Sequence, residues 1–453
     1  MEYMNVKKVL MLFIIIFLIC IGNVKAAEPE ITATSATVID CIDGKFLYSK
    51  NAEEKLYPAS LTKVLTAIVV VENTNLQDEV TISNTAIKNV ESGYLTSNLE
   101  VGEILTVEQL LNLMLISSYN DVANVLAEHI GGSIEGFVDM MNQKANEIGC
   151  TNSHFMNCNG THNENHYTTA HDLALIGKYA MQYDSIKEVV GKTHYDLGAT
   201  NKYIGEDRSY YTSNEMLLSS SSNYYKYASG IKTGFTTPAG NCFMAYAVRY
   251  DIPCVAVVLK STTSDSKYED TKSILNYAFT NNTIRTIATL GTNVQTVNVR
   301  NATHKTKKLN AVLEKTIIAV VNEQNKDTSL EAEIHIADKL KAPIEKGTVI
   351  GTATYEIEGK KYTENLIAES DVEKSNLPLI YVIIFIVILA ILGSARIMSV
   401  NKRKKVLNKI RNKWKESYLL EVWAKPGYPL RSKSVPFGSF FLIIFWLWSF
   451  IRF

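Results

Sequence analysis

Three short motifs follow one another along the chain and together describe a serine nucleophile with a lysine base. They are Ser60-Leu-Thr-Lys63, Ser118-Tyr-Asn120 and Lys232-Thr-Gly234. A serine hydroxyl is a poor nucleophile at neutral pH, so a neighbouring group must accept its proton. The first pattern is common by itself and recurs at Ser229, Ser264 and Ser399. The interpretation of the three motifs as one catalytic site therefore depends on their order, their spacing and the sequence around each.

Ser60 and Lys63 are expected to share one face at the start of a helix. Pro58 precedes them, and an apolar run begins at Leu61. Residues three apart lie on the same helix face, which brings the amine near the hydroxyl. An amine in an apolar pocket beside another cation has a lowered pKa and can act as a base. The alternative is a surface serine and lysine on an ordinary helix.

The second motif interrupts a helical pattern that runs from Val107 to His129. The Ser118 hydroxyl could relay a proton there, and the Asn120 carboxamide could hold a substrate amide. A simpler alternative is a helix-breaking turn in which Asn120 or Asp121 acts as a cap.

The third motif precedes an apolar strand. Lys232 and Thr233 could bind a carboxylate by charge and hydrogen bonding. Gly234 would let a substrate backbone approach closely. The alternative is a turn into the strand with a solvated lysine.

The elements that must position these residues indicate an α+β fold. A hairpin is expected over residues 36–48, helices over 61–72, 107–129 (broken at 117–121) and 134–148, and strands over 241–247 and 253–260. Strands that precede and follow a block of helices predict helices packed on an antiparallel sheet. Residues 292–373 alternate Val, Ile and Thr with polar residues, which predicts a small β-rich domain without a catalytic constellation.

The two ends of the chain predict a secreted, membrane-anchored protein. Lys7 and Lys8 precede an apolar run, which indicates a signal peptide over residues 1–26, with a retained anchor as the alternative. Residues 375–395 carry no charge and are long enough to span a bilayer as a helix. The basic run 402–405 that follows places the tail in the cytoplasm by the positive-inside rule.

We therefore expect five segments: a signal peptide (1–26), a catalytic domain (27–285), a β-rich domain (291–373), a transmembrane helix (375–395) and a basic cytoplasmic tail (396–453). The basic run could fix topology or bind anionic lipid, with a cytoplasmic partner as a further alternative. The short apolar run 440–451 could lie in the membrane interface or pack on a partner.

The composition excludes some other classes of function. The net charge is zero, so no overall field points to nucleic acid. The cysteines are irregularly spaced. This spacing is typical of neither a disulfide framework nor a metal site. Cys150 and Cys158 could pair, but buried thiols are the preferred interpretation.

The motifs give the chain a specific resemblance. The three motifs, Pro58-Ala-Ser-Leu-Thr-Lys63, the segment 159–174 and the segment 341–347 resemble serine-type D-Ala-D-Ala carboxypeptidases, the low-molecular-mass penicillin-binding proteins. The resemblance implies a β-lactamase/penicillin-binding-protein-like catalytic domain followed by the β-rich domain. It implies no cofactor and no metal, so four histidines are not expected to bind zinc: His154, His162, His166 and His171.

The resemblance also implies a role for each motif residue. Ser60 would be acylated by a peptidoglycan stem peptide, with Lys63 as base and Ser118 as proton relay. Asn120 would contact the substrate amide, and Lys232 and Thr233, beside Gly234, would hold the terminal carboxylate. The backbone N–H groups of Ser60 and Phe235 would form the oxyanion hole. Penicillins would trap the acyl-enzyme.

Two departures from the family pattern leave alternatives open. Tyr119 stands where these carboxypeptidases commonly carry glycine, which bears on substrate preference. The predicted span and tail replace the usual amphipathic end. The alternatives are a DD-endopeptidase, a transpeptidase or a β-lactamase on the same fold, or a catalytically silent wall-binding protein. The β-lactamase is the least favoured because no acidic residue is placed to drive fast deacylation.

Overall fold

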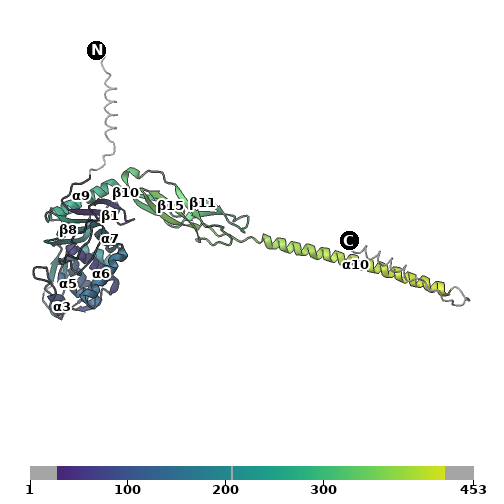
Figure 1. Ribbon diagram of the computed structural model, residues 1–453, viewed down its shortest axis with the longest axis horizontal. Helices are drawn as coiled ribbons and strands as arrows, with labels where there is room; N and C mark the ends of the chain where they lie inside the picture. Colours follow the sequence, from purple (N-terminus) through teal and green to yellow (C-terminus); the bar gives the residue numbers. More distant parts are fainter. Residues whose placement is uncertain (1–27, 206–207, 424–453) are drawn as a thin grey trace, which may run out of the picture. The chain divides into compact units, whose positions relative to one another are not determined.

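The computed structural model describes residues 28–205 and 208–423. The predicted signal peptide and the apolar run 440–451 lie outside these residues. The central feature of the predicted catalytic domain is a five-stranded antiparallel sheet (Figure 1). Its strands, in spatial order, are β2 (Phe46–Lys50), β1 (Ser35–Asp40), β9 (Ile252–Ser261), β8 (Gly240–Arg249) and β7 (Ala228–Thr236). The predicted hairpin and the two predicted apolar strands are confirmed.

Both faces of this sheet are buried because apolar residues occupy both sides of β9. Val255 and Val257 pack into one core with α7 (Ala170–Ala180), whereas Ala256 and Val258 pack into another with α9 (Ser266–Asn281). Alternate residues of a strand point to opposite faces, so a near-continuous apolar strand needs a cover on each side.

The helical part lies between β2 and β7 in the sequence. It comprises η1 (Ala59–Leu61), α2 (Thr62–Asn73), α3 (Asn84–Lys88), α4 (Val107–Ile116), α5 (Asn120–Gly131), α6 (Ile134–Ile148), α7, α8 (Asp184–Val190) and η2 (Glu215–Leu217). Two short ribbons accompany it: β3 (Glu79–Thr81) with β4 (Ile104–Thr106), and β5 (His194–Leu197) with β6 (Arg208–Tyr211). Helix α6 has the predicted bounds and ends at Gly149, whose φ of 99° suits a glycine cap.

The residues that follow form the predicted β-rich part. Strand β10 (Asn282–Ala288) pairs with β13 (Ile317–Asn322), with η3 (Glu323–Asn325) after it. A five-stranded sheet has the order β11 (Asn293–Asn298), β12 (Lys308–Leu313), β16 (Lys360–Ala368), β15 (Val349–Ile357) and β14 (Ala332–Ile336).

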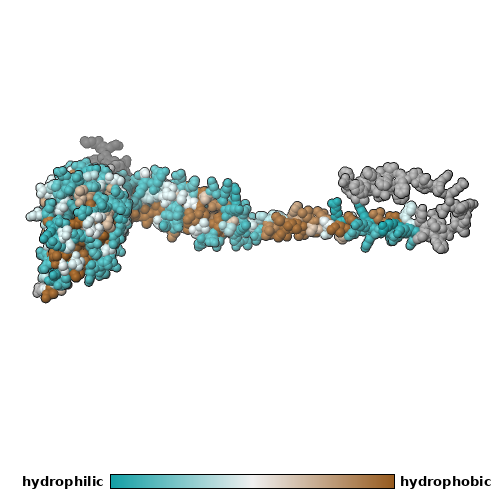
Figure 2. All heavy atoms as spheres, turned by 60° about the horizontal axis from the view of Figure 1, so that its bottom comes forward, coloured by the Kyte–Doolittle hydropathy of each residue, from teal (hydrophilic) through white to brown (hydrophobic). Residues whose placement is uncertain are grey.

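Helix α10 (Leu377–Trp423) begins two residues after the start of the predicted span 375–395 and continues past its end. Its first part is apolar and exposed, and length and composition make it a candidate membrane-spanning helix. Figure 2 shows this brown apolar stretch, followed by a teal hydrophilic one. The helix does not end at Ala395, since the residues that follow include many good helix formers and neither glycine nor proline.

Candidate active site

Ser60 lies in the short helix η1, directly before α2. A close backbone approach fixes it there: a Cβ added to Gly160 would lie 1.9 Å from the Ala59 carbonyl oxygen and 2.9 Å from the Ser60 nitrogen. A Cβ on Gly234 would lie 3.2 Å from the same nitrogen. Ser60 is therefore held between the loop that carries Gly160 and strand β7.

Replacing Gly160 by alanine is expected to displace this segment. The new methyl group would overlap the Ala59 carbonyl, and the φ of 87° is itself unfavourable for alanine. We expect a stability loss of about 3 kcal/mol and at least a tenfold loss of activity, measured by denaturant unfolding and turnover. Gly132→Ala is the matched control, because its φ is 71° and no atom lies within 4 Å. Equal losses in both variants would contradict this account.

The Lys63 side chain is fully buried and reaches three acceptors. Its Nζ lies 3.2 Å from Ser60 Oγ, 2.7 Å from Asn120 Oδ1 and 2.5 Å from the Asn159 carbonyl oxygen. Burial, and then the charge of Lys232, hold the pKa of Lys63 well below its usual range. The amine can therefore be neutral near neutral pH and accept a proton from Ser60.

The second motif occupies the break between α4 and α5. Ser118 has a φ of 65°, and Asn120 is the first residue of α5. The Asn120 backbone N–H and side-chain Nδ2 both donate to the Leu95 carbonyl oxygen, at 3.0 and 2.9 Å. This leaves the amide oxygen facing Lys63, so Asn120 links the base to the loop that carries Leu95.

The third motif lies inside strand β7, not ahead of a strand as the sequence indicated. The reason is that β7 pairs with β8 along the whole motif, from Lys232 opposite Met244 to Phe235 opposite Asn241. Lys232 is buried, and its Nζ donates to the Thr233 carbonyl oxygen at 3.2 Å. Burial, and then the charge of Lys267, lower the pKa of Lys232 to about 7.

A cavity of about 420 Å³ joins most of the predicted residues. The predicted residues that line it are Ser60, Ser118, Asn120, Thr233, Gly234 and Phe235. Lys63 and Lys232 are buried and do not line it, but Lys63 contacts the Ser60 hydroxyl, and Lys232 precedes Thr233 in the chain. The three motifs thus meet around one cavity, although each lies on a different element.

Several further groups at this cavity escaped the sequence analysis. The Ser213 and Thr233 hydroxyl oxygens are 2.6 Å apart. Lys267 Nζ donates to Ser264 Oγ at 3.1 Å, and both residues line the cavity. The only sequence sign of this second Ser–Lys pair was the recurrence of the Ser-x-x-Lys pattern at Ser264, which is common by chance. The Asn159 carbonyl has no sequence signature at all.

The two Ser–Lys pairs differ in their electrostatic surroundings. Burial lowers the pKa of Lys267, but the charges of Glu215 and Asp265 oppose that shift. For Lys63 the two largest contributions, burial and the charge of Lys232, both lower the pKa, and the smaller effect of Asp121 opposes them. Lys63 is therefore the lysine whose pKa is lowered by both burial and a neighbouring cation, whereas Lys267 has two carboxylates that favour its charged form.

The Tyr119 ring lies outside the residues that line the cavity. It packs edge-on against Tyr210, with ring centroids 5.7 Å apart, and against the adjoining core. We expect Tyr119→Ala to cost about 1 kcal/mol of stability through the lost aromatic contact. Turnover should change by less than threefold, as measured on the purified protein. A change above tenfold in KM would show that the ring shapes the substrate site after all.

The cysteines and histidines have other surroundings. The described cysteines are free, and Cys150 and Cys158 are buried thiols, as preferred from the sequence. The His166 ring contacts Thr62 Oγ1 at 3.0 Å, and His171 stacks on Phe46 at 4.4 Å. Within residues 28–205 and 208–423, no three His, Cys, Asp or Glu side chains gather as metal ligands.

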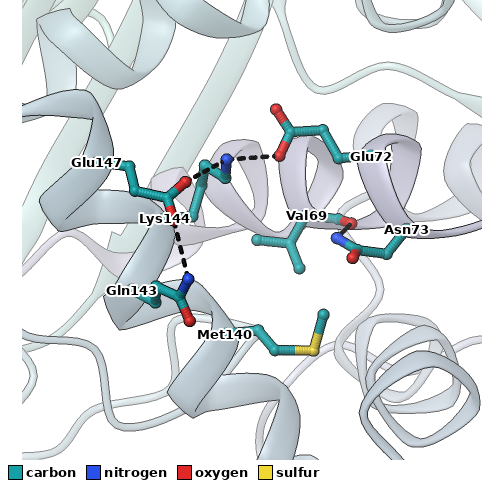
Figure 3. A pocket seen from close by; sticks show the side chains of 7 residues that line it. All are labelled: Val69, Glu72, Asn73, Met140, Gln143, Lys144 and Glu147. Carbon is teal, nitrogen blue, oxygen red and sulfur yellow. Dashed lines mark hydrogen bonds and ion pairs between the residues drawn. The ribbon is translucent and has the colours of Figure 1, made fainter.

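A second hollow of about 260 Å³ lies between α2 and α6 (Figure 3). Lys144 bridges Glu72 at 2.8 Å and Glu147 at 2.6 Å, and Gln143 donates to Glu147 at 2.9 Å. These polar groups satisfy one another, and none belongs to the three motifs. We therefore place the chemistry in the first cavity.

Comparisons with known proteins identify the family of the chain. The family model of D-alanyl-D-alanine carboxypeptidases matches residues 23–263, and that of the penicillin-binding protein 5 C-terminal domain matches residues 284–374. The carboxypeptidase DacF of Bacillus subtilis is 32% identical over 357 residues, which cover 78% of this chain and 88% of the relative. A D-alanyl-D-alanine endopeptidase of Escherichia coli is 30% identical over 52% of this chain and 73% of its own length.

A solved structure shares the fold. The peptidoglycan synthesis regulatory factor (PBP3) from Streptococcus pneumoniae is 25% identical, with a TM-score of 0.65 over 76% of this chain and 100% of that one. The predicted α+β class, with a β-rich second part and a C-terminal apolar helix, is confirmed.

Proposed function

The chain belongs to the D-alanyl-D-alanine carboxypeptidase family of serine peptidases, and on that premise we propose that Ser60 is its nucleophile. The substrate would be a peptidoglycan stem peptide that ends in D-Ala-D-Ala. The observation that carries this proposal is the contact of 3.2 Å between Lys63 Nζ and Ser60 Oγ, made by a buried amine with a lowered pKa.

The proposed reaction has two steps. Neutral Lys63 takes the Ser60 proton while Oγ attacks the carbonyl carbon of the penultimate D-Ala, and the backbone N–H groups of Ser60 and Phe235 stabilise the oxyanion. The C–N bond then breaks, and the departing amine receives the proton by way of Ser118. A water molecule hydrolyses the ester and returns a proton to Ser60. A β-lactam would acylate Ser60 in the same way and leave slowly.

Recognition of the terminal carboxylate falls to the other end of the cavity. Thr233 and Lys267 line the cavity, and Lys232 is buried next to Thr233, where its Nζ donates to the Thr233 carbonyl oxygen. A charge-assisted hydrogen bond is about twice as strong as a neutral one, so these groups favour a substrate with a free carboxyl end. Asn120, which Leu95 holds in place, would contact the substrate amide.

This arrangement predicts that substrate binding weakens as pH rises through about 7. Lys232 must be protonated to attract the carboxylate, and its pKa is lowered to about 7. KM should therefore increase between pH 7 and 9 while kcat changes little, because a bound carboxylate favours the charged lysine. Steady-state kinetics check this, with Lys232→Arg as the control that stays charged. A constant KM across this range would contradict the assignment.

A DD-endopeptidase is the second candidate, since a curated relative carries that name. The two activities are separated by supplying the purified full chain with a D-Ala-D-Ala pentapeptide and with a cross-linked peptide dimer. We expect faster release of D-Ala from the pentapeptide. Cleavage of the dimer without release from the pentapeptide would favour the endopeptidase.

The same proposal places the catalytic part outside the cell. A signal peptide would export it, and the apolar part of α10 would anchor it in the membrane. Protease added to cells stripped of their wall should then degrade the catalytic domain and spare the basic tail. Protection of the catalytic domain would reverse the proposed orientation.

A further inference from the structure

Beyond the apolar stretch, α10 continues as a basic amphipathic helix that the proposed reaction does not use. Between Arg396 and Ser417 the sequence holds nine Lys or Arg residues and one acid, Glu416. Apolar side chains recur among them at helical intervals and are 45–70% exposed: Val400, Val406, Leu407, Ile410 and Trp414. Side chains at such intervals share one face of a helix. We call these five residues the apolar stripe.

Membrane topology alone does not explain this segment. A topology signal needs positive charge close to the span, which residues 402–405 supply. It needs no apolar stripe and no charge as distant as Lys415. On a straight helix at 1.5 Å per residue, Lys415 would lie about 30 Å beyond Ala395. That exceeds the Debye length of about 8 Å at physiological salt, so its charge would not reach the headgroups.

A bend at the end of the span would bring the whole segment to the membrane. Gly393 and Ser394 lie at this position, and such a pair is a common site of helix kinks. In the structure α10 runs without interruption through these residues, so the bend is part of the inference. Pairing of two copies along the stripe is disfavoured, because each copy would bring nine positive charges to the contact.

We infer that residues 396–417 bind the anionic phospholipid headgroups of the leaflet in which the span ends. The apolar stripe would insert at the level of the upper acyl chains, with Trp414 at the interface, while the lysines and arginines contact phosphates. This composition is typical of interfacial helices, whose binding combines buried apolar area with charge attraction. The inference rests on the proposed membrane span, which also keeps the segment near the lipid surface.

Tryptophan fluorescence tests this directly, because all four tryptophans lie in the tail: Trp414, Trp423, Trp446 and Trp448. The last three are replaced by phenylalanine in the full chain, which is then reconstituted into vesicles of phosphatidylcholine, with or without phosphatidylglycerol. We expect Trp414 emission to shift to shorter wavelength, and lipids brominated near the headgroup to quench it, when phosphatidylglycerol is present. The shift should be lost in 1 M salt, where the Debye length is about 3 Å.

A matched pair of charge variants separates the effect of the charges in residues 396–417 from the effect of the overall charge of the chain. Lys404, Lys405 and Lys409 are replaced by glutamine in one variant, and the exposed Lys315, Lys341 and Lys346 of the β-rich part in the other. We expect the first variant to lose the shift and the second to keep it. The inference is overturned if Trp414 emission does not respond to phosphatidylglycerol. This holds whether Trp414 is solvated in both kinds of vesicle or buried against protein in both.

Alkaline extraction of the same vesicles distinguishes failure of the lipid-binding inference from failure of the proposed membrane span. A chain that stays in the membrane while Trp414 remains solvated has a span but no lipid-binding tail, so only the further inference fails. A chain that is extracted lacks the span, and the proposed anchoring fails with it.

Discussion

Replacing Ser60 by alanine is expected to abolish D-Ala release, with a loss of roughly 10⁶-fold in kcat, as for other serine hydrolases that lose their nucleophile. The variant should still fold, because the change removes one oxygen from a partly exposed side chain. It should still bind substrate, since Asn120, Thr233 and Lys232 are intact. Turnover of a D-Ala-D-Ala pentapeptide and a binding measurement on the same protein check both statements.

Ser264→Ala is the matched control for this prediction. Ser264 lines the same cavity and contacts a lysine at 3.1 Å, close to the 3.2 Å of the Ser60–Lys63 pair. We expect this variant to lose less than tenfold in kcat/KM. If Ser264→Ala were inactive and Ser60→Ala active, the assignment of the two Ser–Lys pairs would be reversed.

Lys63→Arg is expected to give the second largest loss, about 10³-fold in the rate of acylation, because a guanidinium group cannot act as a base. Burial in this position favours a neutral amine, which lysine can supply and arginine cannot. The added bulk would also disturb the contacts with Asn120 and the Asn159 carbonyl. Stopped-flow acylation by a chromogenic β-lactam measures the step directly.

The control for Lys63 is Lys63→Met, which removes the charge and the base but keeps an unbranched chain. We expect it to fold with a stability loss of about 1–3 kcal/mol, because the buried Asn120 amide oxygen and the Asn159 carbonyl lose their donor. It should acylate as slowly as the arginine variant. Rapid acylation in Lys63→Met would show that another group takes the Ser60 proton.

Local pattern predicted much of the fold. The bounds of α6 followed from its amphipathic sequence and from Gly149, and the break between α4 and α5 followed from the polar residues 117–121. The contact between Lys63 and Ser60 was also predictable, because residues three apart share a helix face. These features depend on residues close in sequence or on a known combination of motifs.

Other parts of the site depend on contacts that local pattern does not encode. The Asn159 carbonyl meets Lys63 across 96 residues, and any residue type offers a carbonyl. Lys267 reaches the cavity because α9 packs on β8 and β9, which no motif indicated. The third motif was placed ahead of a strand because its lysine and glycine resemble a turn, whereas pairing with β8 makes it part of β7. Long-range packing decides each of these cases.

The most direct test of the account is to identify the serine that a penicillin acylates. The full chain is incubated with benzylpenicillin, denatured, digested and mapped by mass spectrometry. The account predicts an adduct on the peptide that contains Ser60, formed slowly in Lys63→Arg and missing in Ser60→Ala. An adduct on Ser118 or Ser264, or D-Ala release by a protein that never forms an adduct, would contradict it.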